Sequence, residues 1–98
     1  MDELTTILLE KIEKLGDVKS STRGKKTSFT HKKRFATITV KKDKLILDFI
    51  TPSKINHTKL KKVKKLKADK FQHTTVIAKE TDIDPQITGW LMIAHATN

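Results

Sequence analysis

Short runs of lysine and arginine are the feature of this sequence with the most direct chemical meaning. Clustered cationic side chains attract polyanions such as nucleic acid, an acidic protein or an anionic membrane surface. Residues 19–70 hold eighteen Lys and Arg against three Asp, and the whole chain of 98 residues has a formal net charge of +10. The residues that we predict to bind a polyanion are Lys25, Lys26, Lys32, Lys33, Arg34, Lys61, Lys62, Lys64 and Lys65.

The type of basic residue indicates how such a polyanion would be held. Lysine outnumbers arginine nineteen to two, and lysine lacks the planar fork that favours bidentate recognition of bases and phosphates. We therefore expect electrostatic contact with phosphates, as in nucleic acid, without readout of base sequence. One alternative is a solubilising surface over which the lysines scatter without binding anything. Another is a protein-interaction or oligomerisation module.

Other residue types that carry chemistry lack the spacing that they need. The four histidines have no metal-ligand spacing, and the chain has no cysteine that could join them. Residues 23–28 resemble a phosphate-binding loop only superficially, because the two glycines of that loop are not at the required distance. We predict no catalytic residue, no metal site and no cofactor, and we do not expect an enzyme.

Apolar periodicity predicts a helix near each end of the chain. In residues 2–15, leucine and isoleucine recur at spacings of three and four, which places them on one helix face. The second helix, residues 84–96, has Asp84 as its N-cap and Pro85 at the favoured first position. Within it, Gly89 is expected to allow close packing against a neighbouring strand.

Alternating apolar and polar residues predict strands between the two helices. The clearest are 34–41 and 44–50, which form a hairpin. Residues 27–31 and 71–79 are predicted as further strands. Residues 17–26 contain serines and a glycine without apolar periodicity, so we expect a polar loop there.

Residues 60–67 fit no template well. Leu60, Val63 and Leu66 recur every three residues and are separated by lysines. We favour an edge strand, because edge lysines discourage aggregation between strands. A short helix is the alternative.

Together these elements predict one α+β domain over residues 1–98. Consecutive strands without intervening helices favour a single antiparallel sheet. We expect an α-β(4–5)-α two-layer sandwich in which the N- and C-terminal helices pack on one face. Leu8 and Trp90 should be buried in the layer between helices and sheet. The other face would be left to solvent, to a protein partner or to a second copy in a homodimer.

Three stretches carry a resemblance to known families. They are residues 26–49, residues 70–77, and Asp82-Ile83-Asp84-Pro85 with Trp90-Leu91. The chain resembles a bacterial family of domains of unknown function whose members are often labelled as transport proteins. It is also similar to the YjbR/MmcQ-like proteins, which have a frataxin-like (CyaY-like) fold and are often called DNA-binding. The resemblance implies an α-β-α sandwich and no established activity.

The location of the protein is predicted from what the sequence lacks. No apolar run approaches the roughly 18 residues that a transmembrane helix needs, and the first residues are acidic where a signal peptide would be basic. We therefore expect a cytoplasmic protein that does not enter a membrane.

Overall fold

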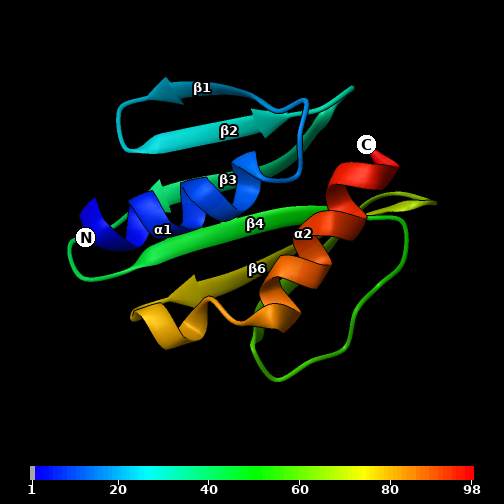
Figure 1. Cartoon of the computed structure of the whole chain (residues 1–98). Coiled ribbons are helices and arrows are strands. Elements are labelled where there is room, and N and C mark those ends of the chain that lie inside the picture. Colours follow the sequence, from blue (N-terminus) through cyan, green and yellow to red (C-terminus); the bar gives the residue numbers. More distant parts are fainter. Residues whose placement is uncertain (1) are drawn as a thin grey trace.

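The helices and strands are described from a computed structural model, which covers residues 2–98. The elements follow the order α1 (Asp2–Glu13), β1 (Lys19–Arg23), β2 (Lys26–Thr30), β3 (Arg34–Val40), β4 (Leu45–Thr51), β5 (Leu60–Lys67), β6 (Lys70–Ile77), the short 3-10 helix η1 (Glu80–Asp82) and α2 (Pro85–Thr97) (Figure 1). The predicted fold class is confirmed, since the two helices lie at the ends of an α+β chain. The sheet has six strands where four or five were predicted.

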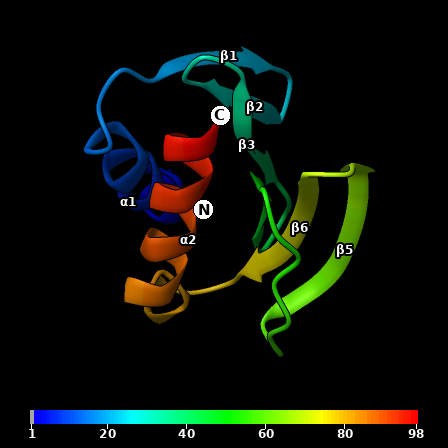
Figure 2. The same ribbon diagram turned by 90° about the vertical axis from the view of Figure 1, so that its right-hand side faces the viewer.

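The strands form one sheet in the order β1-β2-β3-β4-β6-β5, and every neighbouring pair is antiparallel. Both helices lie on the same side of this sheet, as predicted (Figure 2). Because β5 and β4 flank β6, the connection over residues 52–59 must return along the sheet before β5 begins. It does so on the helix side, where the backbone N–H of Ile55 donates to His73 Nε2 at 3.0 Å.

The core lies between the sheet and the helices. In β4, Leu45, Leu47 and Phe49 are fully buried, because alternate side chains of a strand point to the same face. Phe49 stacks on Trp90 of α2 with ring centroids 5.5 Å apart. Leu8 of α1 is also fully buried, so the prediction for Leu8 and Trp90 is confirmed.

The loop predicted over residues 17–26 is wrong. Residues 19–23 form β1, which pairs antiparallel with β2. All five β1 side chains are exposed, so the strand is held by backbone hydrogen bonds and carries no apolar alternation. Gly24, with φ of 59°, provides the left-handed conformation of the tight turn into β2.

Two further predictions concern single elements. Residues 60–67 form the edge strand β5, as favoured, and not the alternative helix. The close packing expected at Gly89 is wrong, because a Cβ atom placed there would meet nothing within 4 Å. A larger residue at position 89 would therefore fit, and packing does not require glycine there.

Candidate polyanion-binding surface

The face of the sheet that carries neither helix has a defined set of basic side chains, and we call it the open face. Its members follow from register. Val63 pairs with buried His73 and so points to the core, which leaves the flanking Lys62 and Lys64 pointing to the open face. Lys26 of β2 points the same way. It pairs with Thr39, and Thr39 pairs with Ile46. Ile46 faces the open side, because it alternates with the buried core residues of β4.

Basic side chains reach the open face from both edges of the sheet. At the β1 edge, Lys19 and Arg23 flank Ser20 and Thr22, which alternate to the core side. The two outermost strands, β1 and β5, lie five strand spacings apart, or about 24 Å along a sheet. With Arg34, Lys67 and Lys70 near one end of the sheet, the open face has eight cationic groups, among them both arginines of the chain.

The centre of the open face is polar. Asp48 pairs in register with Thr37 on one side and Thr74 on the other, and Thr74 Oγ1 donates a hydrogen bond to Asp48 Oδ1. Within residues 2–98, Asp48 is the one acidic residue on any strand. A ligand at the centre of this face would therefore meet hydroxyl groups, a single carboxylate and the half-buried side chains of Ile46 and Val76, between two cationic borders.

One end of the open face leads into a small cavity of about 230 Å³, which we call the end pocket. It forms where the β2–β3 turn meets the end of the β5–β6 hairpin. Its lining residues are Lys33, Arg34, Ile50, Leu66, Lys67, Lys70 and Asn98. Four of these seven side chains are cationic, while Asp69 lies in the adjoining hairpin turn.

Asn98 holds the parts of the end pocket together. Its side-chain amide donates to the carbonyl oxygens of Ile50 at 3.0 Å and Ala94 at 2.8 Å. Its Oδ1 accepts from Lys70 Nζ at 2.5 Å. Its backbone oxygen accepts from the N–H groups of Lys32 and Lys33. Asn98 is only 7% exposed, so these bonds fix one ammonium group and the basic turn relative to the sheet.

Acidic side chains are segregated from the open face. Apart from Asp48, the acidic residues whose side chains are described are Glu3, Glu10, Glu13, Asp17, Asp43, Asp69, Glu80, Asp82 and Asp84. They lie on α1, in turns, or around η1 and the start of α2. The positive charge of the chain is thus concentrated on the open face and in the end pocket, where little opposes it.

The nine basic residues predicted as a site do not form one patch. Lys26, Lys62 and Lys64 lie on the open face, and Lys33 and Arg34 line the end pocket. The remaining four are placed elsewhere. Lys25 lies in the β1–β2 turn, Lys32 is outside the pocket lining, Lys61 lies at a bulge of β5, and Lys65 pairs with Phe71 on the helix side.

Sequence reasoning missed four basic residues of this surface. Lys19 and Arg23 were lost because β1 was predicted as a loop. Lys67 and Lys70 flank the β5–β6 turn. A turn between strands 60–67 and 71–79 was predicted, but the sequence did not place it beside the β2–β3 turn.

The aromatic side chains do not provide a stacking platform on the open face. Phe29, Phe35 and Phe49 are at most 1% exposed, and Trp90 is 8% exposed in the core. Phe71 is half-buried. It points to the helix side, because it lies two residues before His73 on the same strand and His73 faces the core. Contact on the open face would therefore be made by ammonium, guanidinium and hydroxyl groups with phosphates, and not by rings with bases.

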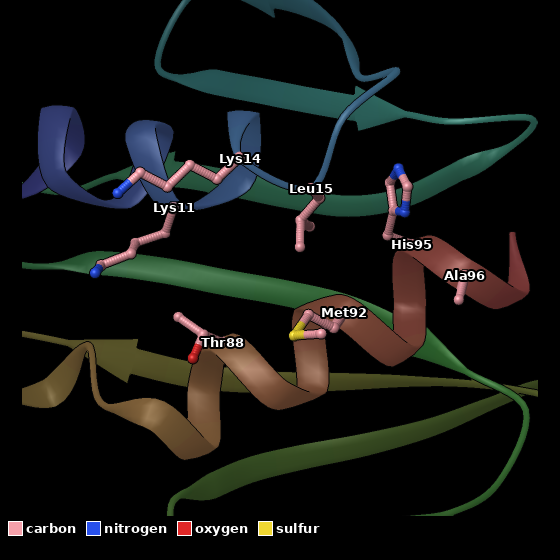
Figure 3. A pocket seen from close by; sticks show the side chains of 7 residues that line it. All are labelled: Lys11, Lys14, Leu15, Thr88, Met92, His95 and Ala96. Carbon is pink, nitrogen blue, oxygen red and sulfur yellow. The ribbon is translucent and has the colours of Figure 1, made fainter.

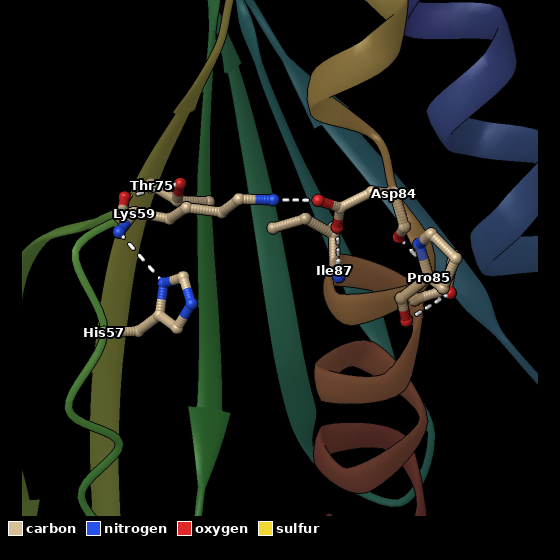
Figure 4. Close-up of polar contacts among 7 residues, drawn as sticks. His57, Lys59, Thr75, Asp84, Pro85 and Ile87 are labelled. Atoms are coloured by element: carbon tan, nitrogen blue, oxygen red, sulfur yellow. Dashed lines mark hydrogen bonds and ion pairs between the residues drawn. The ribbon is translucent and has the colours of Figure 1, made fainter.

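The polar residues on the helix side have structural roles (Figure 4). Asp84 accepts from the N–H of Ile87 at 3.0 Å and so caps α2, and its second oxygen forms an ion pair with Lys59. The N–H of Lys59 donates to His57 Nδ1 at 3.1 Å, and its carbonyl accepts from Thr75 Oγ1 at 2.9 Å. These bonds tie the 52–59 connection to α2. In the described part of the chain, no three His, Cys, Asp or Glu residues are grouped to hold a metal ion.

Comparison with known proteins identifies one family. Its model, described as a domain of unknown function (DUF5655), matches residues 2–98. No curated protein and no solved structure matches the chain. Neither the transport label nor the likeness to YjbR/MmcQ-like proteins gains support from these comparisons. No helix among residues 2–98 has the length and apolar character to cross a membrane.

Proposed function

The chain belongs to the DUF5655 family, and we propose that it binds nucleic acid through phosphate contacts on the open face, without reading base sequence. The observation that carries this proposal is the segregation of charge. Eight cationic side chains share a helix-free face with one carboxylate, and the end pocket extends them. A field of this kind attracts a polyanion over distances comparable with the Debye length of about 8 Å at physiological salt. We propose that the protein binds nucleic acid in the cytoplasm.

The mode of binding follows from the residue types. Six of the eight cations are lysines, which meet phosphates as point charges. With no exposed ring available for stacking, single strands gain no advantage over duplexes. Dissociation constants should fall in the non-specific range, on the order of 10⁻⁴ to 10⁻⁶ M at physiological salt.

The open face is less suited to a homodimer or a protein partner bound by apolar contact. Ile50 is only 6% exposed, and Ile46 and Val76 are half-buried. Monomeric proteins commonly expose apolar patches of a few hundred Å² without using them. The charge of this face would also repel a second copy brought against it.

The test compares two variants that lose the same charge from different faces. Lys26, Lys62 and Lys64, changed together to Gln, lose three cations of the open face. The control changes Lys11, Lys14 and Lys54 to Gln, on α1 and in the 52–59 connection, and leaves the same net charge. Binding is measured by fluorescence anisotropy with several duplex and single-stranded oligonucleotides across a salt series.

The expected result is a difference in salt dependence. If all eight cations contact phosphates, log K falls against log salt with a slope of about −7 on duplex DNA. Removing three contacts flattens the slope by about 2.7, whereas the control keeps the slope of the unmodified protein. Equal loss in both variants would show that only net charge matters. Absence of binding at about 20 mM salt, where screening is weak, or a strong sequence preference, would refute the proposal.

A further inference from the structure

The largest of the cavities described lies on the opposite side of the molecule, between α1 and α2. It is an open groove of about 510 Å³, and we call it the helix groove. Lys11, Lys14 and Leu15 of the α1 end form one wall, while Thr88, Met92, His95 and Ala96 of α2 form the other (Figure 3). Lys11 lies in the last turn of α1, and Lys14 and Leu15 lie in the turn that follows it.

The two walls of the groove are joined at one end. There, His95 Nε2 and the carbonyl oxygen of Gly16 are 2.6 Å apart, which joins the end of α2 to the end of α1. The His95 ring is held in place by His31, which stacks on it with centroids 4.0 Å apart, and by the edge of Phe35. These contacts fix the end of α2 relative to the end of α1.

The walls offer one kind of unsatisfied polar group. Thr88 Oγ1 already donates to the carbonyl of Pro85 at 2.9 Å, and His95 Nε2 already bonds to Gly16. Lys11 and Lys14 have no ion pair within the described part of the chain, although Glu10 and Glu13 lie on the same helix. The groups left to meet a ligand are therefore two ammonium ions.

The rest of the groove is apolar. Met92 is 58% exposed, and Leu15 and Ala96 line the same space. In Figure 3, both lysine side chains extend away from Leu15 and His95, which lie toward the other end of the groove. A matching ligand has an apolar body directed toward Leu15 and an anionic group at the lysine end.

We propose that the helix groove binds a small amphiphilic anion, an apolar chain that ends in a carboxylate. Its volume falls within the range of about 300–1,000 Å³ typical of small-molecule sites. An amphipathic helix of a partner protein, about 10 Å wide, would need a groove open at both ends, and the contact of Gly16 with His95 joins the walls at one. This site is independent of the open face.

The experiment uses 1-anilinonaphthalene-8-sulfonate, an apolar ring system with one sulfonate, as the fluorescent probe. Decanoate should displace the probe, decanol should do so more weakly, and acetate should not displace it. Changing Lys11 and Lys14 to Gln should weaken decanoate binding about tenfold, since two exposed charge interactions are lost. Changing Lys62 and Lys64 to Gln is the matched control and should have no effect. Met92→Asp should abolish binding, and its high exposure makes unfolding no explanation for that loss.

Three outcomes would overturn the proposal. They are equal affinity for decanol and decanoate, equal weakening of binding in the two double variants, and failure of decanoate to displace the probe. Tighter binding of an acidic amphipathic peptide in the same groove would replace the small ligand with a protein partner. DNA binding by the Lys11 and Lys14 variant is measured in parallel and should stay unchanged, so failure here is separable from failure of the nucleic-acid proposal.

Discussion

His73 should make the stability of the fold depend on pH. Its side chain is fully buried on the helix side of β6, where it stacks on Phe49 with centroids 5.1 Å apart. Nε2 accepts the N–H of Ile55 at 3.0 Å, so the imidazole must be neutral with its proton on Nδ1. Nδ1 has no hydrogen-bond partner within residues 2–98. Protonation would break the bond to the 52–59 connection and place a charge in the core.

Burial lowers the pKa of His73 below its ordinary value of 6.5, and the backbone of Phe49 and Phe71 raises it by less. An unfolded histidine binds its proton near that ordinary value, whereas the folded one does so only at lower pH. Below pH 6.5 the unfolded chain therefore holds more protons, and stability falls as pH falls until the folded pKa is reached. One such group contributes at most about 1.4 kcal/mol per pH unit. The stability that neutral His73 contributes is fully present above about pH 6.5.

The assay is urea unfolding between pH 5.5 and 7.5, followed by the fluorescence of Trp90, the one tryptophan of the chain. The His73→Phe variant keeps a ring against Phe49 but leaves the N–H of Ile55 without its acceptor. It should lose about 1–3 kcal/mol at pH 7.5 and show a flatter dependence on pH than the unmodified protein. The reasoning is refuted if the variant keeps the same slope, or if the imidazole of His73 titrates by NMR at or above pH 6.5.

Two further substitutions test the packing around α2. Asn98→Ala should destabilise the protein by about 1–3 kcal/mol, because the buried carbonyl oxygens of Ile50 and Ala94 lose their donor; an unchanged urea midpoint would contradict this. Gly89→Ala should stabilise it by up to about 1 kcal/mol, since alanine favours helix and the added Cβ meets nothing within 4 Å. A lower melting temperature for the alanine variant would show that the space is not free.

The parts of the fold that bury side chains were predictable from the sequence. The β3–β4 hairpin was found because its core-facing residues alternate with polar ones, and α2 was found from its cap and its apolar face. Strand β1 was missed because its five side chains are all exposed. A strand held by backbone pairing and by a polar contact between Thr22 and Thr27 leaves no trace in hydrophobic periodicity.

The candidate site was predictable only in part, for a geometric reason. Lysines that are adjacent in sequence were treated as one cluster, yet neighbouring residues of a strand point to opposite faces. Lys64 and Lys65 therefore separate, the first to the open face and the second to the helix side. The reverse also occurs, since Lys33 and Lys67 are far apart in sequence but meet in the end pocket.

Protection of sheet edges is a competing explanation for part of the basic surface. Charged side chains on edge strands prevent strands of different molecules from pairing, and this accounts for the lysines of β5 whichever face they occupy. It does not account for Arg34 and Lys70, which lie on the interior strands β3 and β6. Nor does it require Asn98 to hold the ammonium group of Lys70 at the mouth of a cationic pocket. Because edge protection is indifferent to the face on which a lysine lies, a dependence of DNA binding on the open face separates the two explanations.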